Sequence, residues 1–77
     1  MEKKRNWKIS CKGYYYLGSY YGTELGVKKF ASKHYRGEIT LYEDTGKVYV
    51  DSGEPVYMSV CRKAGGEWFA INGSPLY

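Results

Sequence analysis

This chain of 77 residues has few of the features on which catalysis, metal binding or membrane insertion usually depend. It holds two cysteines, one histidine and no long apolar run. The longest such run, Tyr14 to Leu17, falls far short of the ~20 residues that a membrane-spanning helix needs. The charged N-terminus leads into no apolar segment, so no secretory signal is predicted. We therefore expect a cytoplasmic protein that makes no membrane contact.

The scarce cysteine and histidine residues argue against chemistry at a metal or a thiol. Cys11 and Cys61 belong to no CxxC pair, and His34 cannot complete a four-ligand zinc site with them. A reducing compartment favours free thiols over a disulfide. Either cysteine could pair with His34 as nucleophile and base, but a histidine on the apolar stripe of a helix is more often a packed side chain. With no HExxH or phosphate-binding loop either, we expect a non-enzymatic protein without cofactor or metal.

The length provides one domain, residues 1–77, with a thin margin of stability. We predict a basic N-terminal tail at residues 1–5 and a loose C-terminal tail at residues 72–77. The formal net charge is +4. All of this excess lies in residues 1–13, because the rest of the chain has as many acidic as basic side chains. The basic character is therefore local, which weakens a general nucleic-acid argument.

Period-two alternation of apolar and polar residues predicts strands over most of the chain. The first strand begins at Trp7 and continues as an extended segment past Gly13, which is interpreted as a bulge. Gly18 and Gly22 are predicted to bracket a turn. Further strands are predicted at 38–42, 47–51, 56–61 and 68–71, joined by hairpin turns at 44–46, 53–55 and 64–67.

One stretch has helical periodicity instead. Thr23 is a suitable N-cap and Gly37 a suitable C-terminal stop, which predicts a helix at about 23–36. Its apolar stripe is formed by Val27, Phe30, Ala31, His34 and Tyr35. The predicted fold class is α+β, with this amphipathic helix packed on one face of a mostly antiparallel four- to five-stranded sheet, in the order β-α-β-β-β-β.

Tyrosine is the residue in excess, with ten copies where about two or three would be typical. If the apolar side chains, including Val48, Val50 and Met58, face the helix, alternation places a set of rings and lysines on the opposite face of the sheet. This predicted partner-binding surface comprises Tyr42, Tyr49, Tyr57, Tyr14, Tyr16, Lys8 and Lys12. Such tyrosines could also serve only as cross-strand pairs that stabilise the sheet.

A second candidate surface is the basic side of the helix. It comprises Lys28, Lys29, Lys33 and Arg36. Lysine-rich exposed helix faces are common for reasons of solubility alone, so the sheet face is the preferred site.

The stretch from residue 24 to 69 resembles small phage anti-CRISPR proteins built from a strand, one helix ending in an AxK-like segment and an antiparallel meander. The likeness rests on Gly26–Lys33, Gly37–Tyr42, the Asp44–Lys47 segment and a late Trp68. It implies a protein that acts in the cytoplasm of a host cell by occupying a surface of a CRISPR effector complex. Many such proteins are acidic, whereas this chain is basic, so simple DNA mimicry does not follow. No functional residue is transferred from the family.

Two functional expectations follow from these patterns. The first is a small inhibitor or adaptor that docks on a protein partner, such as a CRISPR effector subunit, through the tyrosine-rich sheet face or the basic helix face. The alternative is a nucleic-acid-binding module, in which rings stack on bases and the N-terminal Lys and Arg residues contact phosphates.

Overall fold

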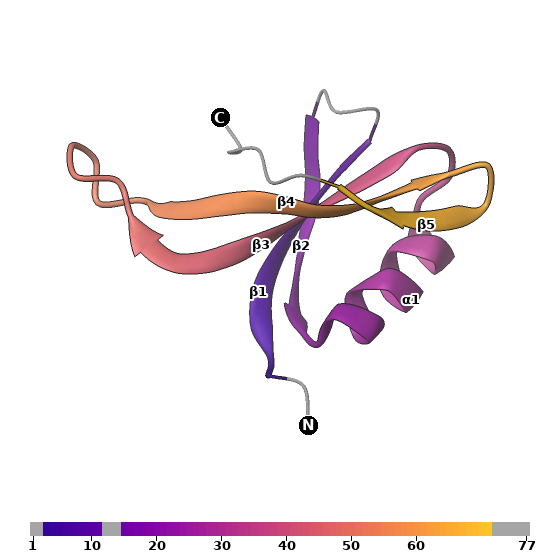
Figure 1. Cartoon of the computed structure of the whole chain (residues 1–77), viewed down its shortest axis with the longest axis horizontal. Helices are drawn as coiled ribbons and strands as arrows, with labels where there is room; N and C mark the ends of the chain where they lie inside the picture. The colour runs from indigo at the N-terminus through magenta and orange to yellow at the C-terminus, as the bar shows by residue number, and fades with distance from the viewer. Residues whose placement is uncertain (1–2, 12–14, 72–77) are drawn as a thin grey trace.

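One helix and five strands make up the part of the chain that the computed structural model describes, residues 3–11 and 15–71, with the backbone alone at 15–17. The elements are β1 (Arg5–Cys11), β2 (Tyr15–Gly22), α1 (Glu24–His34), β3 (Ile39–Val48), β4 (Pro55–Ala64) and β5 (Glu67–Ala70) (Figure 1). The strands form one sheet in the order β2-β1-β3-β4-β5, with every neighbouring pair antiparallel. The predicted α+β fold, with one helix packed on an antiparallel sheet, is confirmed.

The helix α1 begins where the sequence predicted it. The Thr23 Oγ1 atom accepts a hydrogen bond of 3.1 Å from the Gly26 N–H, which satisfies one of the free donors of the first turn. The helix ends at His34, two residues earlier than predicted. The extended backbone of Tyr35 caps it, and the Tyr35 N–H donates to the Ala31 carbonyl at 2.9 Å.

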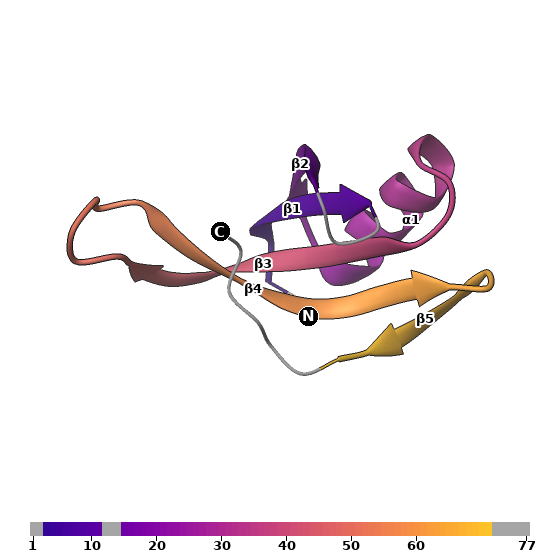
Figure 2. The ribbon, with the colours of Figure 1, turned by 90° about the horizontal axis from the view of Figure 1, so that it is seen from above.

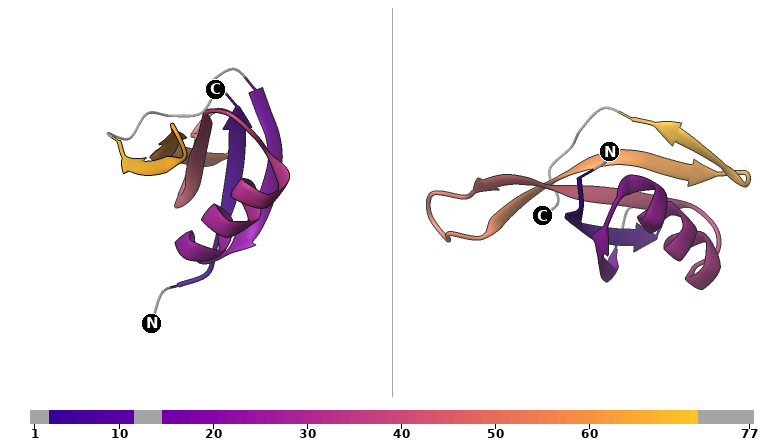
Figure 3. Two further views of the ribbon diagram at one scale, coloured as in Figure 1. Left: turned by 90° about the vertical axis from the view of Figure 1, so that its right-hand side faces the viewer. Right: turned by 90° about the horizontal axis from the view of Figure 1, so that it is seen from below.

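The core lies between α1 and the middle of the sheet. Strand register places Ile9 opposite Leu41, and Leu41 opposite Cys61, so these side chains share the face that α1 covers. Trp7 is also buried here, and its Nε1–H donates to the Gly22 carbonyl at 2.9 Å. The fully buried apolar side chains are Trp7, Ile9, Val27, Ala31, Ile39, Leu41 and Cys61. Figure 3 shows α1 on one side of the sheet, as predicted.

The segment before the helix folds as two strands rather than as one strand and a turn. Gly18, predicted to begin a turn, lies inside β2, and Gly22 ends that strand. Packing explains why both positions are occupied by glycine. A Cβ atom on Gly18 would lie only 2.4 Å from the Tyr35 hydroxyl, and one on Gly22 would lie 2.7 Å from the Tyr20 ring. Close approach of aromatic side chains, rather than a turn, therefore explains both residues.

The strand after the helix is longer than predicted. The Asp44-Thr45-Gly46 segment does not turn the chain. The Asp44 carboxylate accepts from the Gly46 N–H at 2.9 Å, and Gly46 has a φ of 82°, which produces a local irregularity. Pairing with β4 resumes at Val48 opposite Pro55, so the hairpin turn lies at 49–54. β3 thus joins the predicted strand 38–42 to the first two residues of the predicted strand 47–51, whose last three residues lie in the turn.

Some predicted positions of side chains also change. On α1, Val27 and Ala31 are buried, whereas Phe30 is half-buried and His34 is exposed. In the predicted N-terminal tail, Arg5 belongs to β1 and its Nε lies 3.4 Å from the Glu43 carboxylate. The predicted loose tail at 72–77 lies outside the described residues.

Candidate functional site

The sheet face opposite α1 contains part of the predicted tyrosine surface. Tyr42 lies opposite Lys8 in the β1–β3 pair, and Tyr57 lies opposite Asp44 in the β3–β4 pair. The Lys8 Nζ atom lies 4.8 Å from the centroid of the Tyr57 ring, in a cation–π contact. The structure therefore brings Tyr42, Tyr57 and Lys8 together, as predicted, with both rings half-buried.

The remaining predicted members do not complete this surface. Tyr49 was predicted on the same face, but it lies in the turn beyond β3, because β3 runs on through the expected turn. Lys12 and Tyr14 lie outside the described residues, and Tyr16 is placed in β2 by its backbone alone. Small buried side chains occupy much of the rest of this face: Ser59 lies opposite Tyr42, and Ser10 lies opposite Thr40. The face thus has fewer rings than alternation suggested.

A more concentrated site lies between α1 and β5. The ring of Trp68, on β5, is half-buried on the same sheet face as α1, because register places it opposite Lys63 of β4. The Lys28 Nζ atom of α1 and the Lys63 Nζ atom each lie 6.0 Å from the centroid of this ring. Two cations from different elements therefore lie near one aromatic ring.

This ring forms one wall of a hollow of ≈ 480 Å³, named here the α1–β5 groove. The opposite wall is one stripe of the helix, since positions 25, 28, 29, 32 and 33 follow helical spacing. Leu25, 56% exposed, provides apolar surface beside the lysines. The groove is lined by Leu25, Lys28, Lys29, Ser32, Lys33 and Trp68.

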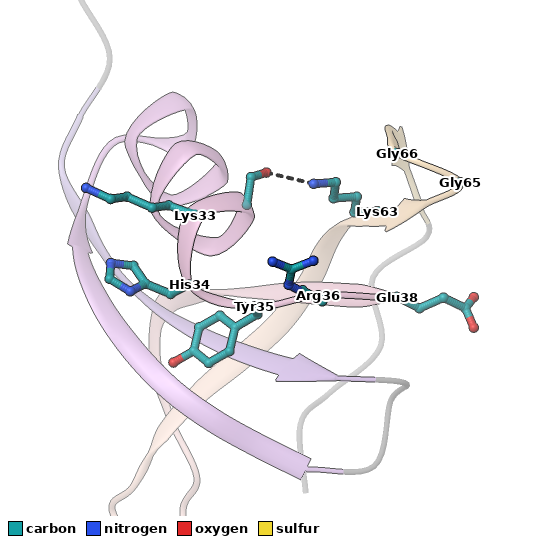
Figure 4. A pocket seen from close by; sticks show the side chains of 10 residues that line it. Lys33, His34, Tyr35, Arg36, Glu38, Lys63, Gly65 and Gly66 are labelled. Carbon is teal, nitrogen blue, oxygen red and sulfur yellow. Dashed lines mark hydrogen bonds between the residues drawn. The ribbon is translucent and has the colours of Figure 1, made fainter.

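A second hollow of ≈ 520 Å³ continues the groove past the C-terminal end of α1. Ser32 and Lys33 line both hollows. The Lys63 Nζ donates to the Ser32 Oγ at 3.1 Å, and the Arg36 side chain extends toward this hydrogen bond (Figure 4). Glu38 points away from it and is ion-paired with Arg62. The second hollow is therefore lined by three cationic side chains, Lys33, Arg36 and Lys63, together with the Ser32 hydroxyl and the ion-paired Glu38.

The charges around the two hollows are mainly positive. Lys28, Lys29, Lys33, Arg36 and Lys63 line them. Two acidic side chains lie nearby. Glu24 neutralises Lys28, with which it forms an ion pair at 3.0 Å, and Glu38 is paired with Arg62, which lies outside the hollows. The basic helix face, predicted as the alternative site, is thus enlarged by Trp68 and Lys63. Sequence reasoning missed both, because the pairing of β5 with β4 decides which side of β5 faces the helix.

The thiols show little sign of catalytic use. Both cysteines are free, as predicted. Burial raises the pKa of the Cys61 thiol to about 11, so it stays protonated near neutral pH and is a weak nucleophile. The Cys11 thiol lies 3.7 Å from the Arg36 carbonyl, an acceptor that cannot serve as a base. Within residues 3–11 and 15–71, no group of three His, Cys, Asp or Glu side chains is placed to hold a metal ion.

No helix in the described part of the chain is long and apolar enough to cross a membrane. No family model, curated protein or solved structure matches this chain.

Proposed function

We propose that this protein is a non-enzymatic binding protein that holds single-stranded nucleic acid in the α1–β5 groove. One observation carries the proposal: the ammonium groups of Lys28 and Lys63 each lie 6.0 Å from the centroid of the half-buried Trp68 ring. Proteins that bind single strands combine an aromatic ring, on which a base stacks, with cations that follow the backbone. The groove has both the aromatic ring and the cations on one surface.

The residues next to Trp68 could also contact a single strand. A base stacked on Trp68 would place its sugar–phosphate backbone along the helix stripe, where Lys29 and Lys33 are exposed. The next phosphate would reach the second hollow, where Arg36 and Lys63 converge beside Ser32. These groups contact phosphates and one π-face, which every base has, so binding is expected to depend little on sequence.

The test is fluorescence anisotropy with a labelled oligothymidine, comparing two substitutions on one strand. Trp68→Ala removes the proposed stacking ring and should weaken binding about 5-fold or more, since each base–aromatic stack contributes ~1–3 kcal/mol. Phe69→Ala is the matched control. Phe69 is 51% exposed and projects to the other sheet face, opposite Arg62, so its removal should leave affinity nearly unchanged.

Salt dependence provides a second readout of the same groove. Neutralising three or four phosphates should give a slope of log K against log salt of about −2 to −3 for a single strand. No measurable binding at low salt, or equal effects of the Trp68 and Phe69 substitutions, would contradict the proposal.

A second candidate is the small inhibitor that docks on a larger protein, in the manner of the anti-CRISPR proteins that the sequence resembles. The observation that favours it is the contact between Lys8 and Tyr57 beside Tyr42, on the face away from α1. Aromatic anchors of this kind dominate protein interfaces. Such docking should change little with salt, and Tyr57→Ala should weaken it while leaving oligonucleotide binding intact.

A further inference from the structure

The hairpin of β3 and β4 projects well beyond the part of the sheet that α1 covers. Residues 45–56, named here the arm, form the end of the molecule opposite to α1 and β5 (Figures 1 and 2). Its apolar side chains are open to solvent: Val48 is 60% exposed, Tyr49 38% and Val50 98%. Three adjacent exposed apolar residues on a projection are typical of a contact surface.

The tip of the arm has a defined backbone rather than an open loop. The Tyr49 N–H donates to the Glu54 carbonyl, and the Gly53 N–H donates to the Tyr49 carbonyl, both at 2.8 Å. The Glu54 N–H also donates to the Ser52 Oγ at 3.2 Å. Because these bonds already order the turn, the arm loses little conformational entropy when it binds a partner.

The chemistry of the tip is apolar with negative charge beside it. Asp51 and Glu54 lie within the turn, and the one lysine of the arm, Lys47, lies further back. The matching surface must therefore be apolar with positive charge beside it. The α1–β5 groove has this composition, with Leu25 and Trp68 among Lys28, Lys29 and Lys33.

We propose that the arm binds the α1–β5 groove of a second copy of this chain. The arm and the groove lie at opposite ends of the longest axis, which extends 37 Å. Two copies placed side by side in antiparallel orientation would each insert an arm into the groove of the other. Such a pair is closed and two-fold symmetric, with two equivalent contacts, and this arrangement is the commonest among soluble oligomers. Direct pairing of two arms would instead place the carboxylates of both tips close together.

This inference does not depend on the proposed function, but the two interact. A groove occupied by the arm of a second copy is closed to nucleic acid, so a ligand and the second copy compete. If both proposals hold, the oligonucleotide converts the pair into single chains. If only this one holds, the pair forms and the oligonucleotide has no effect on it.

The test is analytical ultracentrifugation of the full chain from micromolar to millimolar concentration. We expect a reversible dimer that weakens at roughly 1 M salt, where the Debye length falls to about 3 Å. Val50→Asp should weaken dimerisation at least ~10-fold, because it replaces an apolar contact by a charge. Ser52→Asp is the matched control. It adds the same charge to the same turn, keeps the valines and retains an acceptor for the Glu54 N–H, so the dimer should persist.

A mixing experiment separates this arrangement from arm-to-arm pairing. Lys29→Glu with Lys33→Glu changes two exposed groove residues and should also give single chains. This groove variant has an intact arm, and the Val50→Asp variant has an intact groove. When the two are mixed, one of the two contacts can therefore form, and a weak heterodimer should appear. A wild-type protein that stays monomeric throughout, a Val50→Asp variant that still dimerises, or a groove variant that dimerises as well as the wild type would each overturn the proposal.

Discussion

The two ends of β3 hold apolar side chains in opposite environments. Ile39 and Leu41 are 1% and 0% exposed, whereas Val48, on the same strand, is 60% exposed. The helix accounts for the difference. Its 11 residues span about 16 Å, while the 10 residues of β3 span about 33 Å. One helix of this length can cover only half of the strand, so the covered half forms the core and the uncovered half forms the arm.

The largest expected effect comes from truncating matched apolar side chains in the two halves. Leu41→Ala should lower the free energy of unfolding by ~2–5 kcal/mol, because it leaves a cavity under α1. That is much of the stability of a domain this small. Val48→Ala should change it by less than about 0.5 kcal/mol, as for an exposed site. Urea denaturation measures both. A cost for Val48→Ala close to that of Leu41→Ala would show that the arm is packed in the folded protein.

Thiol reactivity sharpens the comparison from the covered side. Cys61 lies under α1 with a pKa of about 11, while Cys11 is half-buried at the end of β1. Burial both shields the Cys61 sulfur and keeps it protonated, so an alkylating reagent should label Cys11 faster than Cys61 in the folded protein. Mass spectrometry of the labelled peptides decides this, and equal rates would show that α1 opens readily.

The raised pKa of Cys61 also sets a pH dependence. The folded state holds the proton more tightly than the unfolded state, whose thiol has a pKa of 9.0. The resulting stability is therefore complete below pH 9 and is lost as the pH rises from about 9 to about 11. Measured relative to Cys61→Ala, which lacks this group, the wild type should lose stability over that range. A constant difference between the two proteins would contradict the burial of this thiol.

The helix that defines the covered half depends on its cap. Thr23→Ala removes the acceptor for the Gly26 N–H and should cost about 1 kcal/mol, while Thr23→Ser keeps the oxygen and should cost less. Chemical denaturation followed by circular dichroism measures both. If Thr23→Ser costs as much as Thr23→Ala, packing of the threonine methyl group, and not the hydrogen bond, stabilises this end of α1.

The smallest effect concerns single charges in the two regions. Lys29→Ala, in the groove, should lower oligonucleotide affinity modestly and reduce the salt slope by about 1, as loss of one phosphate contact does. Lys47→Ala, in the arm, removes the same charge and should leave the slope unchanged. Equal changes for both variants would indicate that overall charge, and not the groove, governs binding.

The sequence was sufficient for the parts of the fold that depend on local patterns. The spacing of Val27 and Ala31 and the cap at Thr23 predicted α1, and alternation predicted an antiparallel sheet. What failed depended on pairing between distant segments. The Asp44-Thr45-Gly46 turn signal produced an irregularity in β3, because pairing with β4 continues beyond it. Gly18 was wrongly predicted to begin a turn, because the group that leaves no room for a side chain there, the Tyr35 hydroxyl, is distant in the sequence.

The candidate site shows the same division. Alternation correctly placed Tyr42 and Tyr57 on one face with Lys8, but the shifted turn removed Tyr49 from it. Helical spacing found the lysines of α1. The position of Trp68 near both Lys28 and Lys63 depends on the register of β5 with β4, which no local pattern encodes.

The most direct test of the proposed function is an NMR titration of the labelled protein with a short oligothymidine, following every backbone amide. The account predicts saturable shifts on the exposed side of α1, from Leu25 to Arg36, and at Trp68 on β5. The tyrosine face around Tyr57 should stay unchanged apart from effects of dimer dissociation. Shifts centred on Tyr42 and Tyr57, or none that saturate, would contradict the assignment of the α1–β5 groove as the binding site.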